Sequence, residues 1–218
     1  MITLAGWIGS KWEHSHELSR KVIHIGCGLL LPISYWLQLP RWIALTAALL
    51  AIGLVLLNYQ RKWLGLIEDV DRKTYGTIFY CTSISTLILI FWNPDPVAMI
   101  AGSLVMAISD GLAGLIGKGV QSPTWRFNDQ TKSLAGTTTM LLSTFLILMT
   151  VSHLTGNVLP IRFALLVSLI VTFLEQWSVY GIDNLTVPIM TALMFSLAAN
   201  SDQLLAFFSN TVPLKTLL

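Results

Sequence analysis

Charged residues are scarce in this sequence. Asp, Glu, Lys and Arg make up 11% of the 218 residues, whereas hydrophobic residues make up 54%. A soluble domain of this length usually carries about a quarter charged residues, because its surface faces water. The mean hydropathy of +0.70 points the same way. The composition therefore excludes an ordinary soluble domain and favours a protein whose solvent is lipid.

Cysteine and net charge are also low. Cys27 and Cys81 each lie inside an apolar run, and their spacing fits neither a disulfide framework nor a metal site. We interpret them as buried apolar thiols. The net charge of +2 is too small, and the basic residues too scattered, to indicate nucleic-acid binding. Residues 1–21 carry several charges and no apolar segment ahead of a cleavage site, so they do not resemble a cleaved signal peptide.

Long apolar runs dominate what is present. Most approach the roughly 20 residues that a helix needs to cross a bilayer, and prolines fall in several of the short connections between them. We therefore predict an all-α, polytopic membrane protein with about seven spanning helices, forming one domain over residues 1–218. The predicted spans are Val22–Gln38, Trp42–Asn58, Thr77–Trp92, Val97–Gly117, Leu134–Leu154, Phe163–Trp177 and Leu185–Phe208.

Lys and Arg residues predict the orientation of these spans. If the N-terminus is cytoplasmic, ten basic residues lie on the cytoplasmic side and three lie opposite, which is a clear positive-inside bias. The cytoplasmic set is Lys11, Arg20, Lys21, Arg61, Lys62, Arg72, Lys73, Lys118, Arg126 and Lys132, and the opposite set is Arg41, Arg162 and Lys215.

Two carboxylates fall inside predicted spans. A charged side chain in lipid costs several kcal/mol by insertion scales, so it is usually retained for function. Asp110 lies within the cytoplasmic half of the fourth span and Glu175 near the end of the sixth. The segment EQWSVYGIDNLTVP adds Asp183 and Asn184 nearby. Carboxylates gathered at one membrane face could hold a divalent cation such as magnesium. The alternative interpretation is polar packing satisfied by neighbouring helices.

Two basic segments open helices at the same face. In ELSRKVIHIG, Arg20 and His24 are four residues apart and share a helix face, with Lys21 beside them. In DRKTYGTIFY, Arg72 precedes the third span. Snorkelling and topology determination are the alternative explanation for such basic residues.

A third segment combines glycines, lysines and a helix start. SDGLAGLIGKG is followed, after about a dozen polar residues, by TKSLAGTT. Glycines, a lysine and a helix N-terminus are the ingredients of a phosphate-binding cradle, although the G-x-x-x-x-G-K-[ST] pattern of a Walker A loop is absent. The candidate nucleotide-binding residues here are Gly114, Lys118, Lys132, Ser133 and Gly136.

The four segments, in this order, resemble the family of CTP-dependent polyprenol kinases, which includes dolichol, phytol and farnesol kinases. The resemblance covers roughly residues 17 to 190, and DRKTYG and DNLTVP look closest to the phytol and farnesol branch. It implies phosphoryl transfer from CTP to an isoprenoid alcohol such as phytol, within the bilayer and with Mg²⁺. It also implies phytol salvage toward tocopherol and a plasma or thylakoid membrane, in an organism that is expected to be a cyanobacterium.

The resemblance also implies residue roles. Asp110, Glu175 and Asp183 are the expected catalytic and metal-binding carboxylates, with Asn184 beside them. Arg20, Lys21, His24 and Arg72 join the glycine segment around the nucleotide. Many relatives carry an acidic residue between the KS pair and the glycine of KSLAG, where this chain has Ala135, so the metal assignment depends on the other carboxylates.

Other functions fit parts of the pattern. A dolichol or diacylglycerol kinase of the same family would share the site but change the alcohol. A phosphatidate cytidylyltransferase-like enzyme would release pyrophosphate instead of CDP. A small ion-coupled transporter could also use intramembrane carboxylates and glycine-broken helices, although no inverted repeat is evident. The sequence does not decide between a monomer and an oligomer.

Overall fold

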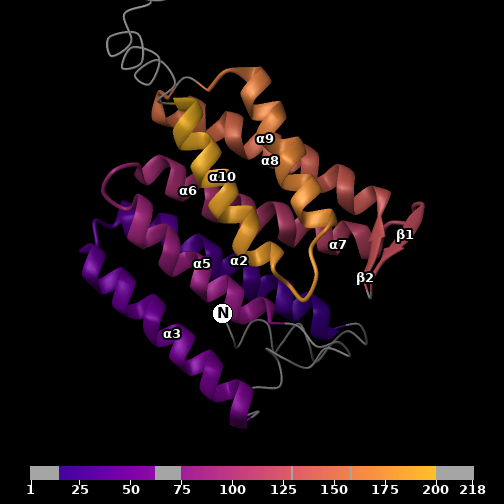
Figure 1. Ribbon diagram of the computed structural model, residues 1–218, viewed down its shortest axis with the longest axis horizontal. Helices are drawn as coiled ribbons and strands as arrows, with labels where there is room; N and C mark the ends of the chain where they lie inside the picture. The colour runs from indigo at the N-terminus through magenta and orange to yellow at the C-terminus, as the bar shows by residue number, and fades with distance from the viewer. Residues whose placement is uncertain (1–14, 62–74, 129, 158, 200–218) are drawn as a thin grey trace, which may run out of the picture.

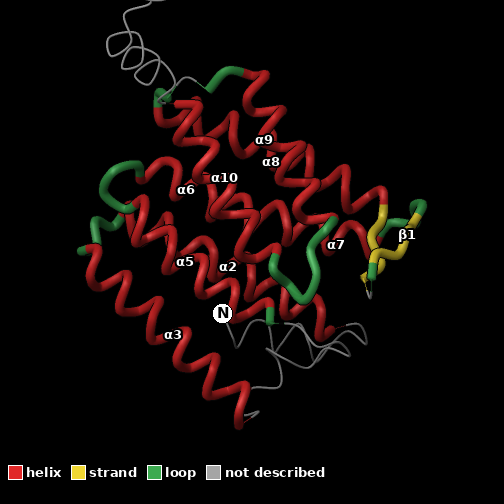
Figure 2. The backbone as a smooth tube through the Cα atoms, viewed as in Figure 1, coloured by secondary structure: helices red, strands yellow, loops and turns green. Residues whose placement is uncertain are grey.

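The structure is a computed structural model that describes residues 15–61, 75–128, 130–157 and 159–199, with side chains from residue 21 onward. Helices dominate the described chain, and a short hairpin interrupts them (Figure 2). The elements are α2 (Ser15–Trp36), α3 (Arg41–Arg61), α5 (Gly76–Phe91), α6 (Pro96–Leu104), η1 (Val105–Asp110), α7 (Gly111–Gly119), β1 (Thr124–Phe127), β2 (Gln130–Ser133), α8 (Leu134–Thr155), α9 (Ile161–Gln176) and α10 (Asp183–Ala199).

The helix boundaries follow local chemistry. Asp95 is the N-cap of α6, where its carboxylate accepts a hydrogen bond from the Ala98 amide at 3.0 Å, and Pro96 occupies the first turn. Ser133 caps α8 in the same way, accepting from the Gly136 amide at 3.1 Å. Gly156 ends α8 with φ of 70°, a left-handed conformation that favours glycine. Caps of these kinds satisfy backbone groups that the helix leaves unpaired.

The helices lie roughly side by side, with α3 at the edge (Figure 1). α10 packs against α5, α6 and α9, while α8 packs between α7 and α9. The buried side chains between them are largely apolar, including Phe195, Leu87 and Met140. Leucines cover the outer face of α3, where Leu50 and Leu57 are 64% and 48% exposed. Such an apolar exterior suits a lipid environment.

Three of the described helices are long and apolar enough to cross a membrane, judged by length and composition: Arg41–Arg61, the continuous run Pro96–Gly119, and Leu134–Thr155. Gly76–Phe91 and Asp183–Ala199 are shorter apolar helices. The prediction of a mostly helical membrane protein is confirmed at this level. Seven spans, a cytoplasmic N-terminus and a single domain stay predictions.

The expectation of an all-α chain is wrong at the connection between α7 and α8. β1 and β2 form an antiparallel hairpin in which Thr124 pairs with Ser133 and Phe127 with Gln130. Asn128, with φ of 50°, begins the turn, a conformation that Asn tolerates better than most residues. Phe127 packs on Trp177 at 5.1 Å between ring centroids, which fastens the hairpin to the end of α9. Strands this short and this polar have no hydrophobic period to reveal them.

Candidate active site

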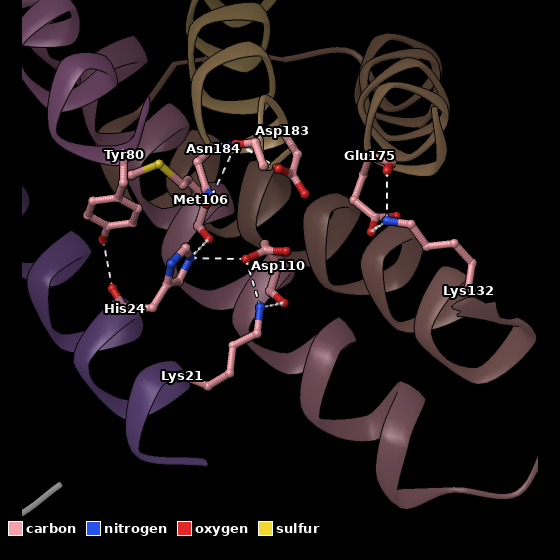
Figure 3. Close-up of polar contacts among 10 residues, drawn as sticks. Lys21, His24, Tyr80, Met106, Asp110, Lys132, Glu175, Asp183 and Asn184 are labelled. Carbon is pink, nitrogen blue, oxygen red and sulfur yellow. Dashed lines mark hydrogen bonds and ion pairs between the residues drawn. The ribbon is translucent and has the colours of Figure 1, made fainter. Parts of the chain in front are cut away.

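Three carboxylates from separate elements lie close together (Figure 3). Asp110 is the last residue of η1, Glu175 lies near the end of α9, and Asp183 is the first residue of α10. Each offers one carboxylate oxygen, and these three oxygens lie within 4.8 Å of one another. Like charges repel at this separation, so the arrangement needs compensating positive charge.

Lys21, from α2, neutralises Asp110. Its Nζ lies 3.0 Å from Asp110 Oδ2 and donates to the Asp110 backbone oxygen at 3.2 Å. The lysine is 7% exposed, so water screens this pair far less than a surface pair. The single ammonium therefore binds both the side chain and the backbone of Asp110 and holds the end of η1 against α2.

His24 stands one helical turn further along α2 and contacts the same carboxylate. Its Nε2 lies 3.1 Å from Asp110 Oδ2 and 2.9 Å from the Met106 backbone oxygen. Both partners accept hydrogen bonds, so Nε2 carries the proton. Tyr80 on α5 supports this turn by donating to the His24 backbone oxygen at 2.7 Å, and the two rings pack at 4.6 Å.

The π-helical stretch η1 presents Asp110 to these partners. Short π segments inside helices are rare and occur frequently at functional sites. Here Met106, in the middle of the stretch, turns a backbone oxygen to the His24 ring, and Asp110 closes the stretch. The irregular helix thus brings the Met106 backbone oxygen and an Asp110 carboxylate oxygen within hydrogen-bonding distance of the His24 imidazole.

Lys132, the third residue of β2, pairs with Glu175. Its ammonium donates both to the Glu175 carboxylate and, at 2.9 Å, to the Glu175 backbone oxygen. The second carboxylate oxygen of Glu175 accepts from the Gln176 side-chain amide. Glu175 is 8% exposed, and this pairing explains how a buried charge is tolerated there.

Asp183 differs from the other two carboxylates. Its backbone N–H donates to the buried Ser178 hydroxyl at 2.9 Å, and its Oδ1 accepts from the Asn184 backbone N–H at 3.1 Å. The Asn184 side-chain amide donates to the Gly181 backbone oxygen at 3.3 Å. Within the part of the chain that the structure describes, no ion pair to Asp183 occurs. Asp183 is therefore the carboxylate best placed to accept a proton or a cation from outside.

The donor set fits a divalent cation. Three carboxylates face two lysines in the described site, which leaves a net charge of about −1 if His24 is neutral. Hard cations such as magnesium prefer carboxylate oxygens and are usually bound by one or two of them together with substrate phosphates. Asp110, Glu175 and Asp183 supply such oxygens close together, and Asn184 lies next to Asp183 in the chain.

The predicted glycine cradle consists largely of close helix contacts. A Cβ on Gly114 would lie 2.5 Å from Lys21 Cε, and one on Gly117 would lie 2.8 Å from Ser133 Oγ. A Cβ on Gly136 would lie 3.0 Å from the Ala113 backbone oxygen. Ser133 in turn donates to the Gly117 backbone oxygen at 3.0 Å. These residues bring α7, α8 and Lys21 together, and their contact with a nucleotide stays a prediction.

A cavity of about 1510 Å³ opens from the carboxylates and has two parts. Polar and charged residues surround one end, including Lys118, Arg126, Asn128 and Gln130 beside the carboxylates and lysines. Apolar residues of α2, α3 and α5 enclose the other. Cys27 and Cys81 line the cavity and are partly exposed, so the prediction of buried thiols is wrong.

The structure thus brings most of the predicted site residues together around one cavity. Arg72 and the Arg20 side chain lie outside the described residues. Sequence reasoning missed Tyr80, Ser178 and Gln176, which support His24, Asp183 and Glu175 respectively. A tyrosine inside an apolar run is more often core than site, so the residue types alone offered little signal.

Comparisons with known proteins give one group of relatives. A phytol kinase of Synechocystis sp. is 38% identical over 181 residues, covering 82% of this chain and 78% of that protein. A probable chloroplastic phytol kinase 1 of Glycine max is 30% identical, covering 80% of this chain and 64% of its own length. A chloroplastic farnesol kinase of Arabidopsis thaliana is 27% identical, with 65% of this chain and 49% of that protein covered. No family model matches the sequence, and no solved structure gives a significant match.

Proposed function

The chain belongs to the family of phytol and farnesol kinases, and from this premise we propose that it is a CTP-dependent kinase of an isoprenoid alcohol, phytol first among the candidates. The observation that carries the proposal is the junction of charged and apolar surfaces in one cavity, where three clustered carboxylates and two lysines adjoin an apolar groove. A water-soluble nucleotide and a lipid alcohol need such a junction in order to meet.

The proposed reaction is an in-line displacement at the γ-phosphorus of CTP. The alcohol oxygen forms a bond to phosphorus while the bond to the bridging oxygen breaks, so that CDP leaves with the bonding electrons. The alcohol proton passes to a carboxylate and then to water, and the products are prenyl phosphate, CDP and a proton. Asp183 is the proposed acceptor, since no described cation pairs with it.

Catalysis of phosphoryl transfer is largely positioning and electrostatic stabilisation of the phosphoryl oxygens, and positively charged groups provide that stabilisation. Lys21 and Lys132 are proposed to exchange part of their carboxylate contact for phosphate oxygens, with Lys118 at the cavity edge as a third cation. Asp110 and Glu175, with Asn184 beside the cluster, would hold Mg²⁺, which leaves Asp183 to accept the alcohol proton. When bound, this cation supplies charge neutralisation at the phosphates.

The proposed orientation places this site on the cytoplasmic side, where nucleotides are available. The positive-inside bias supports it, since Lys21, Lys118, Arg126 and Lys132 all line the cavity at the charged end. The proposed topology is seven spans with a cytoplasmic N-terminus, in a plasma or thylakoid membrane. The proposed partners of the protein are a nucleoside triphosphate, an isoprenoid alcohol and the bilayer. Nucleic acid is not among them.

An assay with γ-labelled CTP and magnesium tests the reaction directly. The purified protein, in detergent, is expected to transfer label to phytol or to another member of a panel of geranylgeraniol, farnesol, dolichol and diacylglycerol. Label in dolichol or diacylglycerol alone would move the protein to another branch of kinases. Pyrophosphate release with a phosphorylated lipid would indicate a cytidylyltransferase, and a folded preparation that labels none of the panel would refute the proposal.

Replacing Gly114 with Ala should slow the kinase about a hundredfold, because a misplacement of about 1 Å at a reacting centre can have that effect. The new Cβ would lie 2.8 Å from Lys21 Nζ, so the ammonium must shift relative to Asp110. Turnover with saturating substrates is the measurement. Gly53→Ala is the matched control, since nothing lies within 4 Å of a Cβ there. Equal activity in the two variants would show that the position of Lys21 is unimportant.

A further inference from the structure

The apolar part of the cavity is a groove in which four alanines, between the bulkier Ile43 and Leu54, form part of the α3 wall. Ala44, Ala47, Ala48 and Ala51 of α3 all line it, followed by Val55 and Asn58 toward the charged end. Spacings of three, four and seven residues place the alanines on one face of the helix. Ile23 and Leu31 of α2, and Ile84 and Ile88 of α5, are among the residues that complete the lining.

The C-terminal end of α3 lies at the charged end of the cavity. Tyr59 stacks on Tyr75 at 5.7 Å, and the Tyr75 backbone N–H donates to the Tyr180 backbone oxygen at 3.0 Å. Tyr180 lies in the connection that leads to Asp183. The alanine face of α3 therefore runs from the carboxylates toward the start of the helix, and each residue marks a depth along the groove.

We propose that this groove binds the hydrocarbon tail of the alcohol and that the alanine face of α3 determines the length of tail accepted. The inference rests on the proposed kinase function and adds the position of the tail. The groove is continuous with the charged end, so a hydroxyl at the carboxylates leaves its tail no other apolar continuation within the described cavity.

Shape must provide this selectivity, because hydrophobicity cannot. A tail that leaves the bilayer for the groove exchanges one apolar environment for another, since lipid tails are as apolar as leucine. The net gain from burial is therefore small, in contrast to the gain when the same tail leaves water. A narrow groove instead discriminates between tails of different length by steric exclusion. Enlarging a small side chain in its wall therefore narrows the groove most.

Depth along α3 identifies the residue to change. Ala47 lies eleven residues before Asn58, or about 16 Å at 1.5 Å per residue. An extended chain advances about 3.5 Å per three bonds, so the backbone of phytol, with fifteen carbon–carbon bonds, reaches roughly 18 Å. The eleven bonds of farnesol reach only about 13 Å by the same spacing. For a hydroxyl held level with Asn58, the longer tail passes Ala47 and the shorter one ends before it.

Ala47→Phe is therefore expected to lower kcat/KM for phytol about tenfold and to leave farnesol within about twofold of its wild-type value. Ala47 is exposed to the groove rather than packed in the core, so the larger ring has room, and farnesol turnover verifies the fold. Leu50→Phe is the control, because Leu50 is 64% exposed and lies on the outer face. An unchanged ratio between the two alcohols in Ala47→Phe would overturn the proposal.

The two thiols in the groove allow a test that needs no turnover. Cys27 and Cys81 line the cavity beside the charged end, so phytol and farnesol should both slow their labelling by N-ethylmaleimide in phospholipid nanodiscs without nucleotide. In Ala47→Phe, protection by phytol should weaken while protection by farnesol persists. Protection without any kinase activity would support the groove and refute the kinase. Kinase activity on phytol without protection would retain the kinase and overturn the groove.

Discussion

Asp110→Asn is expected to reduce kinase activity by at least about a thousandfold, the upper range for loss of one electrostatic group in a preorganised site. The substitution keeps the size of the side chain and removes its charge. Asp110 contacts both Lys21 and His24 and contributes one of the three clustered carboxylate oxygens. The variant therefore loses a proposed metal ligand and the partner that positions two basic groups.

The same variant should still fold and insert. In this variant the Lys21 ammonium no longer faces a charged group at residue 110. Carboxylate oxygens of Glu175 and Asp183 lie within 4.8 Å of the one that Asp110 offers, so negative charge remains near the ammonium. Insertion can be followed by membrane fractionation and by elution as a single species in detergent. Asp95→Asn is the matched control, because Asn is as good an N-cap as Asp and Asp95 caps α6 away from the cluster. Near-normal turnover in Asp110→Asn would remove the metal assignment.

Much of the fold was predictable because the bilayer imposes long apolar helices. Each predicted apolar run overlaps a helix of the described residues, and the part of the last run beyond residue 199 lies outside them. The prolines at 40, 96 and 160 flank or open helices. The carboxylates were also predictable, because charged residues are rare in membrane-spanning segments and even one of them indicates a functional site. The prediction that Asp110 and Glu175 share a depth needed only the direction of each helix.

The unpredicted features depend on contacts between distant segments. Lys21 and Asp110 are 89 residues apart, and Lys132 and Glu175 are 43 apart, so no local pattern specifies either pair. The hairpin was not predicted because each of its strands has only four residues and most of these residues are polar. The Ala135 backbone N–H donates to the Ser122 hydroxyl at 3.1 Å, and the carboxylate cluster forms without an acidic side chain at residue 135.

Lys132→Met is expected to abolish activity and also to destabilise the protein. Glu175 is 8% exposed, and removal of one partner from a buried ion pair typically costs about 3–5 kcal/mol, because the remaining charge is left uncompensated. Thermal unfolding in detergent should therefore shift to a lower temperature. A loss of activity in this variant alone would leave open whether Lys132 binds phosphate or only stabilises the site.

The double variant Lys132→Met, Glu175→Gln separates the two roles. Replacing both charges removes the uncompensated carboxylate, and paired neutral groups are often as stable as the ion pair they replace. Thermal stability should therefore return close to wild type. Activity should stay at least about a hundredfold below wild type, because the proposed phosphate ligand and the proposed metal ligand are both absent. Recovery of activity together with stability would show that this buried pair is structural, and it would confine the chemistry to Asp110, Asp183 and Lys21.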